Sequence, residues 1–139
     1  MSTSNTLATQ VLKGVFGSSK GSTAPATLYI ALSSTAPTLS SGVLTNITEP
    51  SAGGYARLAV TNNDSNWTIS GRVAANTLQL EFTTATGSWG SAVTHAVIYD
   101  ASTSGNALAS CALGSSTTVS TGTRVVLAAS ALTVTVPTS

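Results

Sequence analysis

Charged residues are scarce in this sequence of 139 residues, and so are aromatic residues and cysteines. Only 6% of the residues are charged, the formal net charge is +1, and 5% are aromatic. Without an excess of basic side chains, the chain has little attraction for nucleic acids or anionic membranes. Its apolar runs are too short to span a bilayer, and its one cysteine, Cys111, has no partner for an intrachain disulfide. We therefore expect neither nucleic-acid nor membrane partners.

Small polar residues dominate what is present. Serine and threonine make up roughly a third of the chain, yet the mean hydropathy is +0.31. Disordered chains combine low hydrophobicity with high net charge, so this composition favours a folded domain with one core. A net charge close to zero gives an isolated monomer little colloidal protection, which favours assembly.

A short helix is predicted near the N-terminus, from about Asn5 to Phe16. Its apolar residues recur with helical spacing and form one stripe: Leu7, Val11, Leu12, Val15 and Phe16. Ser4 or Asn5 can cap the start, and Gly17 stands where a left-handed C-terminal cap is expected. Because a helix of about three turns is not stable alone, we expect the stripe to dock on its own domain or on a neighbouring subunit.

After a linker over residues 17–22, the pattern is that of short strands joined by turns. The expected strands cover residues 27–32, 55–60, 77–82, 93–99, 107–112, 117–119, 123–127 and 132–136. In residues 77–82, Leu78, Leu80 and Phe82 are expected to point inward. The predicted fold class is all-β, an antiparallel β-sandwich (jelly-roll or Greek-key-like) of about seven or eight strands with one short N-terminal α-helix. We expect a single domain over residues 1–139, with the helix and linker in 1–22 and the sandwich in 23–139.

Catalytic chemistry has little support in the sequence. The one histidine, His95, would need Asp64 or Asp100 to orient it and a serine to activate. The nearest approach to a nucleophile elbow, residues 87–90, has the wrong spacing. His95 also lies within a predicted strand, so we expect a core or interface imidazole. The sequence predicts no enzyme and no hydrolase activity.

Metal and cofactor sites are equally unsupported. One histidine and one cysteine cannot complete a zinc site within a chain. Asn62, Asp64 and Asn66 mimic the start of a calcium loop, but its later glycine and glutamate are missing, so we expect an Asx-turn loop. No phosphate-binding glycine loop is present. The prediction is no metal and no cofactor.

Four aromatic side chains offer a possible platform for sugars: Tyr55, Trp67, Trp89 and Tyr99. A chain with so few aromatic residues needs most of them in its core, and we expect core packing for these. A carbohydrate-binding module remains an alternative, which loss of glycan binding on changing Trp67 or Trp89 would support.

Several blocks in order along the chain resemble small tailed-bacteriophage virion structural proteins. These blocks are residues 25–32, 53–57, 85–90 running into 93–101, 105–108 and 132–136. The sequence departs from that pattern at Ala96 and Ala107, which loosens the core slightly. Proteins of this group are similar to head decoration or cement proteins and are often labelled tail fibre proteins. The resemblance implies a virion component, made in the host cytoplasm.

Within these blocks, several residues have a plausible structural role. Residues 53–54 are two glycines that set the entry to the following strand, and Trp89, between glycines, is expected to turn inward as an anchor. Arg57 is expected to pair with Glu81 or Asp100 across strands. The structural or interface candidates are Leu7, Val11, Leu12, Val15, Tyr55, Arg57, Trp89, His95 and Tyr99.

Three functions follow as hypotheses. The leading one is a capsid decoration or cement protein that packs as an oligomer on the major capsid protein. The alternatives are a tail component, either a fibre segment or an adaptor that contacts a host receptor, and the carbohydrate-binding module. Threonine and alanine on the outward strand faces, with few charges to protect sheet edges, predict a closed homo-oligomer, with a trimer favoured. Each interface is expected to reach about 1,000 Å².

Overall fold

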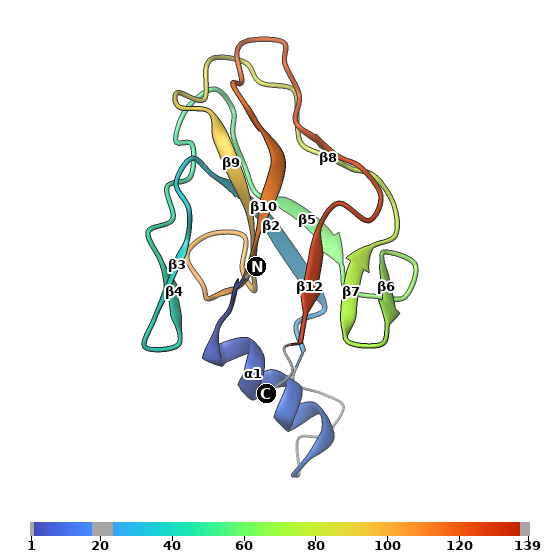
Figure 1. Cartoon of the computed structure of the whole chain (residues 1–139). Coiled ribbons are helices and arrows are strands. Elements are labelled where there is room, and N and C mark those ends of the chain that lie inside the picture. The colour runs from blue at the N-terminus through green and yellow to red at the C-terminus, as the bar shows by residue number, and fades with distance from the viewer. Residues whose placement is uncertain (1, 18–23, 137–139) are drawn as a thin grey trace.

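The computed structural model describes residues 2–17 and 24–136 of the chain (Figure 1). Within these residues it contains one helix, α1 (Asn5–Val15), and twelve strands. The strands are β1 (Ser2–Thr3), β2 (Thr27–Ser33), β3 (Thr38–Ser40), β4 (Val43–Thr45), β5 (Leu58–Thr61), β6 (Trp67–Ser70), β7 (Val73–Asn76), β8 (Leu80–Glu81), β9 (Val93–Tyr99), β10 (Ala107–Thr117), β11 (Val126–Leu127) and β12 (Thr133–Thr135).

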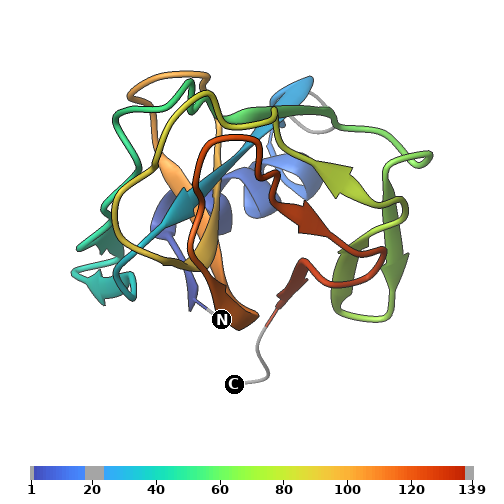
Figure 2. The ribbon, with the colours of Figure 1, turned by 90° about the horizontal axis from the view of Figure 1, so that it is seen from above.

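The strands form layers of antiparallel sheet. Five strands in the order β1-β10-β9-β2-β5 make the main sheet. The second layer consists of the three-stranded sheet β12-β7-β6 and the pair β11-β8, and β3 with β4 forms a separate hairpin. In Figure 1 the hairpin lies on one side of the main sheet and β6, β7, β8 and β12 lie on the other, as Figure 2 also shows from above. The predicted all-β sandwich with one short helix is confirmed.

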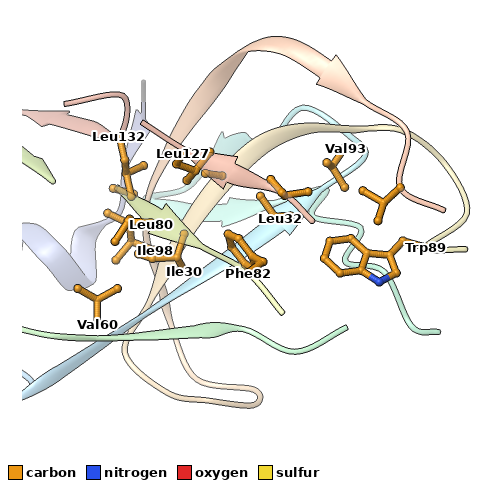
Figure 3. Close-up of a cluster of buried hydrophobic side chains, with 14 of the residues drawn as sticks. Ile30, Leu32, Val60, Leu80, Phe82, Trp89, Val93, Ile98, Leu127 and Leu132 are labelled. Atoms are coloured by element: carbon orange, nitrogen blue, oxygen red, sulfur yellow. The ribbon is translucent and has the colours of Figure 1, made fainter. Parts of the chain in front are cut away.

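The hydrophobic core lies between the main sheet and the second layer. Because successive side chains of a strand point to opposite faces, Ile30 and Leu32 of β2 face the same side as Ile98 of β9, and Ile30 pairs directly with Ile98. Phe82 and Leu132 meet them from the second layer (Figure 3). All five are nearly or fully buried. This packing joins the two layers.

The opposite face of the main sheet is also covered. Ala31, Val97 and Tyr99 form a second buried cluster there. Ile47, which follows the β3–β4 hairpin, packs against this cluster. The central strands are therefore buried on both faces, which explains why their sequences carry small and apolar residues instead of lysine and glutamate. Part of the surface that was expected to need another subunit is covered by the chain itself.

The edge of β10 is also protected within the chain. β1 pairs with it through Ser2 opposite Ser110 and Thr3 opposite Ala109. Farther along, the pairing of β10 with β9 is irregular between Ala112 and Thr117. Bulges of this kind disrupt the regular edge that another chain would need for pairing. The expectation of undefended edges is therefore wrong for this strand.

Several predicted strand segments have other bounds in the structure: β5 replaces 55–60, β10 extends 107–112 to Thr117, and only the end of 123–127 forms β11. Two segments differ more. In residues 77–82 only β8 is a strand, and Leu80 and Phe82 are buried while Leu78 is exposed. The carbonyl of Leu78 accepts a hydrogen bond from Asn76 Nδ2 instead of from a strand partner. Residues 117–119 do not form a separate strand, although Val119 is buried and its carbonyl accepts from the Trp89 backbone N–H at 3.0 Å.

The helix begins and ends where its capping residues predict. Ser4 is the N-cap, with its Oγ accepting from the Leu7 N–H at 3.3 Å. Gly17, directly after the Phe16 C-cap, has φ +82°, the left-handed conformation expected there. The rest of the predicted linker, residues 18–22, lies outside the described residues. No residue of α1 is buried, so the chain's own sandwich does not cover the whole stripe, and docking on a neighbouring subunit, the other predicted alternative, stays a prediction.

Candidate interaction surface

The apolar stripe of α1 is largely uncovered. Leu7, near the start of the helix, packs against the hydrophobic core. Farther along, the exposed fraction is 49% at Val11, 58% at Leu12, 65% at Val15 and 67% at Phe16. Side chains of this size and number form an exposed apolar patch on the order of a few hundred Å², the size that marks contact surfaces. Nothing in the described part of the chain covers it.

A groove of about 250 Å³ runs between α1 and the sandwich. We call it the Trp67 groove, and its main apolar lining residues are Leu7, Val11, Leu28, Trp67, Ile69 and Val134. No ionisable side chain lines it. In Figure 1, α1 lies below the end of the sheets where β12 and β2 approach it. The groove therefore joins the helix stripe to the sandwich as one continuous apolar surface.

Strand β6 supplies both a buried and an exposed wall of this groove. Trp67 and Ile69 are two residues apart and so share a face of the strand. Trp67 is 7% exposed, whereas Ile69, nearer the end of β6, is 66% exposed. Strand β6 was not predicted from the sequence. Between the asparagine-rich loop before it and the glycine after it, the strand has four residues, too few to show a clear alternation of apolar and polar side chains. The apolar residues at 67 and 69 were the available signal.

Arg57 lies at the centre of a second, buried cluster. Its Nε donates to Glu49 Oε1 at 3.0 Å and its second guanidinium nitrogen, Nη2, to Glu49 Oε2 at 2.7 Å. The guanidinium carbon lies 3.5 Å from the centre of the Tyr99 ring, as in a cation–π contact. The Tyr55 hydroxyl donates to Glu49 Oε1 at 2.8 Å. The predicted pairing of Arg57 with Glu81 or Asp100 is therefore wrong.

Both carboxylates expected for Arg57 have other partners. Glu81 pairs with Arg124 at 2.9 Å, where both side chains are about half exposed. Asp100 accepts from the backbone N–H of Asn106 at 2.7 Å and from its Nδ2 at 2.8 Å, which closes the loop between β9 and β10. Glu49 lies eight residues before Arg57, in the same segment between β4 and β5.

The remaining donors of Arg57 hold the loop between β9 and β10. Its Nη1 donates to the carbonyls of Ala101 and Ser104, both at 2.8 Å. Ser104 has φ +53°, a conformation that a turn imposes. The Arg57 side chain is 7% exposed and the Glu49 side chain 24%, so the bidentate pair is shielded from water. This cluster connects the β4–β5 loop to the β9–β10 loop and leaves little of Arg57 for a ligand.

The surroundings of this cluster shift three pKa values. Burial raises the pKa of Tyr55 far above its usual range, and the hydrogen bond to Glu49 adds to the rise, although the hydrogen bond from the Leu32 N–H opposes it. Burial alone would lower the pKa of Arg57, but hydrogen bonds and attraction to Glu49 raise it. Burial also raises the pKa of Tyr99, as does the charge of Glu49. The tyrosines stay neutral and Arg57 stays charged.

Trp89 is the inward anchor that the sequence predicts. Its side chain is 4% exposed, and its Nε1 donates to the Gly53 carbonyl at 3.1 Å. Its ring meets the Tyr55 ring edge-on, with centroids 5.1 Å apart. Gly53 has φ +65°, and a Cβ there would collide with the carbonyl of Gly87. The two glycine-containing segments are thus held together at one contact that admits no side chain.

The aromatic residues are used in packing. Trp67, Trp89 and Tyr99 are buried, and Tyr55 is half-buried and bonded through its hydroxyl to Leu32 N–H and Glu49. The prediction of core packing is confirmed for them. The sugar platform would therefore lack exposed rings at these four positions.

His95 is half-buried in β9, between Ser33 of β2 and Ala112 of β10. Its Nδ1 lies 2.9 Å from Thr94 Oγ1. Asp100, one of the two candidates to orient it, is engaged with Asn106. Its predicted place within a strand is confirmed, and its role in an interface stays a prediction.

The asparagine-rich loop forms the predicted Asx turn, with Asn63 as its acceptor. Asn63 Oδ1 accepts from the backbone N–H groups of Ser65 and Asn66, both at 3.1 Å.

Across residues 2–17 and 24–136, no group of three histidine, cysteine or carboxylate side chains is placed to hold a metal ion. Among the same residues, no helix is long and apolar enough to cross a membrane.

A family model described as podophage GP4 fiber I protein gp80 matches residues 2–135. No curated protein matches the chain. The match spans the blocks on which the resemblance to phage virion proteins rests, up to residue 135 of the last block, and that resemblance is confirmed at this level. A fiber family supports the tail-component alternative better than capsid decoration, for which nothing further was found. The chain therefore belongs to the family of podophage GP4 fiber I protein gp80, a family of phage virion structural proteins.

Proposed function

We propose that this protein is a structural unit of a phage fibre, the tail-component alternative above, and that it works by contact between proteins. The observation that carries this proposal is the match of residues 2–135 to a fiber family. The match covers the helix as well as the sandwich, so the interaction surface belongs to the part of the chain that the family shares.

The groups that catalysis would need are engaged in holding the fold. Arg57 and Glu49 satisfy each other and the neighbouring loops. Asp100 closes a hairpin loop through Asn106. His95 has Thr94 as its side-chain partner and lies in a strand, without a carboxylate bonded to it. These arrangements support a binding protein without enzyme activity.

The exposed stripe of α1 and the Trp67 groove are the surfaces through which such a unit would attach to other virion components. Apolar contact of this kind needs no ion pairs, which fits a chain with 6% charged residues. The two ion pairs among the described residues, Arg57–Glu49 and Arg124–Glu81, both lie within the chain.

Purified particles provide the test. Antibody against the protein, carried on gold and viewed by electron microscopy, should label the tail region, and quantitative mass spectrometry should find few copies per particle. Particles that lack the gene are the control for labelling. Labelling over the whole head shell with hundreds of copies would overturn the proposal in favour of capsid decoration. Absence from particles would overturn a virion role altogether.

A further inference from the structure

The C-terminal half of α1 forms a projecting apolar surface, which we call the α1 knob. It consists of Leu12, Val15 and Phe16, each more than half exposed. None of these three lines the Trp67 groove of its own chain. The knob is thus free of contact with the groove, although both lie at the same end of the molecule.

The Trp67 groove has the matching character of a receiving surface. Its lining is almost wholly apolar and carries no charge. Ile69, on its rim, is 66% exposed. The knob also carries no charge, so the two surfaces are compatible with each other and less so with a charged partner.

One polar atom indicates that the groove is incomplete in a single chain. Trp67 Nε1 is the one buried side-chain nitrogen or oxygen without a hydrogen-bond partner among the described residues. A buried donor left unpaired is destabilising. Trp67 is part of the groove wall, so the residue with the unpaired donor belongs to the surface that a partner would cover.

The helix itself also requires a covering partner. It has 11 residues, none of them buried, and an internal glycine, Gly14. Helices of this length are marginal in water without packing, and glycine weakens them further. A contact that covers the knob would stabilise the helix and bury its apolar side chains.

We propose that a second copy of this chain supplies that contact, with the α1 knob of one copy seated in the Trp67 groove of the next. This proposal rests on the proposed fibre function, because it names the partner of the interaction surface described there. Each copy carries both halves of the contact, so a closed ring covers every knob and every groove. A different protein would have to cover both the knob and the groove, whereas a second copy of this chain brings the matching half of each. The knob of one copy and the groove of the next are the two sides of each contact, and a standard interface takes about 800 Å² from each side.

A disulfide experiment tests which surfaces meet. In a Cys111→Ala background, one chain carries Phe16→Cys and a second, of different length through a tag, carries Ile69→Cys. After mixing and mild oxidation, a non-reducing gel should show a product of one chain of each kind. Replacing Ile69→Cys by Leu39→Cys is the matched control, because Leu39 is also about half exposed but lies on the β3–β4 hairpin. Loss of the mixed product with that control is expected.

Sedimentation equilibrium gives a second measurement that does not depend on cysteine. The wild-type chain should sediment above its 13.8 kDa monomer mass, Leu12→Asp and Ile69→Lys should sediment as monomers, and Leu39→Asp should remain assembled. Circular dichroism checks that each variant is folded. A wild-type monomer throughout the micromolar range overturns the proposal, as does equal crosslinking to Leu39→Cys.

These outcomes are separate from those that test the fibre function. A monomer in solution that still labels the tail, and that loses its place in particles with Leu12→Asp, would identify another virion protein as the occupant of the surface. That result overturns the proposed second copy while leaving the fibre function intact. Assembly of a protein that is absent from particles would overturn the fibre function instead.

Discussion

Asn76 bonds through its side chain to three backbone groups, one two residues away and two in the segment between β11 and β12. Its Nδ2 donates to the carbonyls of Leu78 and Ala128, and its Oδ1 accepts from the Leu132 N–H, all at 2.8 Å. The residue is fully buried. A buried polar group that satisfies every donor and acceptor around it specifies one arrangement of those segments.

Replacing Asn76 by alanine is expected to lower the free energy of unfolding by about 3 kcal/mol or more, because it leaves buried backbone groups unpaired. Urea denaturation measures this. The matched control is Asn63→Ala, which removes an exposed Asx turn and should cost less than about 1 kcal/mol. Equal losses in the two variants would contradict the role assigned to Asn76.

Tyr55 and Tyr99 are expected to make the free energy of unfolding decrease at alkaline pH. Their pKa values are raised by burial in the folded chain above the ordinary value of 10.0. The unfolded chain therefore releases these protons at lower pH than the folded chain, so their contribution is fully present below pH 10 and is lost as the pH rises above it. Urea denaturation from pH 9 to pH 11, in steps of roughly half a unit, should show decreasing stability above about pH 10.

The variant Tyr55→Phe separates this effect from other alkaline changes. It removes one of the two tyrosines and should make the decline with pH less steep, even though its stability near neutral pH is lower through loss of the hydrogen bonds to Leu32 and Glu49. A decline of unchanged slope would show that Tyr55 is not responsible.

At the scale of single elements, α1 differs from the strands because its apolar side chains face outward. We expect Leu12→Asp to change the free energy of unfolding of the monomer by less than about 0.5 kcal/mol, since the residue is 58% exposed. A buried stripe would instead make this change cost several kcal/mol, through an unpaired charge. Leu132→Asp, at 1% exposure, is the comparison, and it should cost at least about 3 kcal/mol. Thermal unfolding at concentrations below assembly measures both.

The elements that the sequence predicted well are those whose own residues determine them. β9 has the predicted bounds, and β2 extends one residue beyond them, because each is a seven-residue strand with apolar residues on both faces. The helix followed from its spacing and its caps. Short strands such as β3, β4 and β6 were missed, because two to four residues carry no period and their pairing depends on distant segments.

The candidate interaction surface was predicted less completely, because it too depends on contacts between distant segments of the chain. The helix stripe could be read from spacing, but its exposure depends on how close the sandwich approaches it. The partner of Arg57 could not be chosen among the available carboxylates, since the loop path that brings Glu49 to it is a tertiary feature. Ile69 was missed because its exposure reflects where β6 ends relative to α1.

For the whole molecule, assembly is expected to persist in about 1 M salt, because Coulombic contacts are what salt screens. The contact surfaces proposed here lack ionisable side chains, and the two ion pairs of the described residues lie within one chain. Light scattering at micromolar concentration, with and without salt, measures the change in mass. Dissociation to 13.8 kDa in high salt would show that charged residues hold the copies together.

The burial of the central strands on both faces also determines how fast their backbone amides exchange with solvent. Strands β2 and β9 each pair with a neighbouring strand on both sides within the main sheet. Exchange of their amide protons with deuterium therefore requires opening of the entire domain, whereas amides of α1 exchange through local fraying. Hydrogen exchange should therefore separate a slow centre from a fast N-terminal helix. On assembly, slowing of exchange confined to α1 and β6 would reveal a fold whose interior is complete before its copies meet.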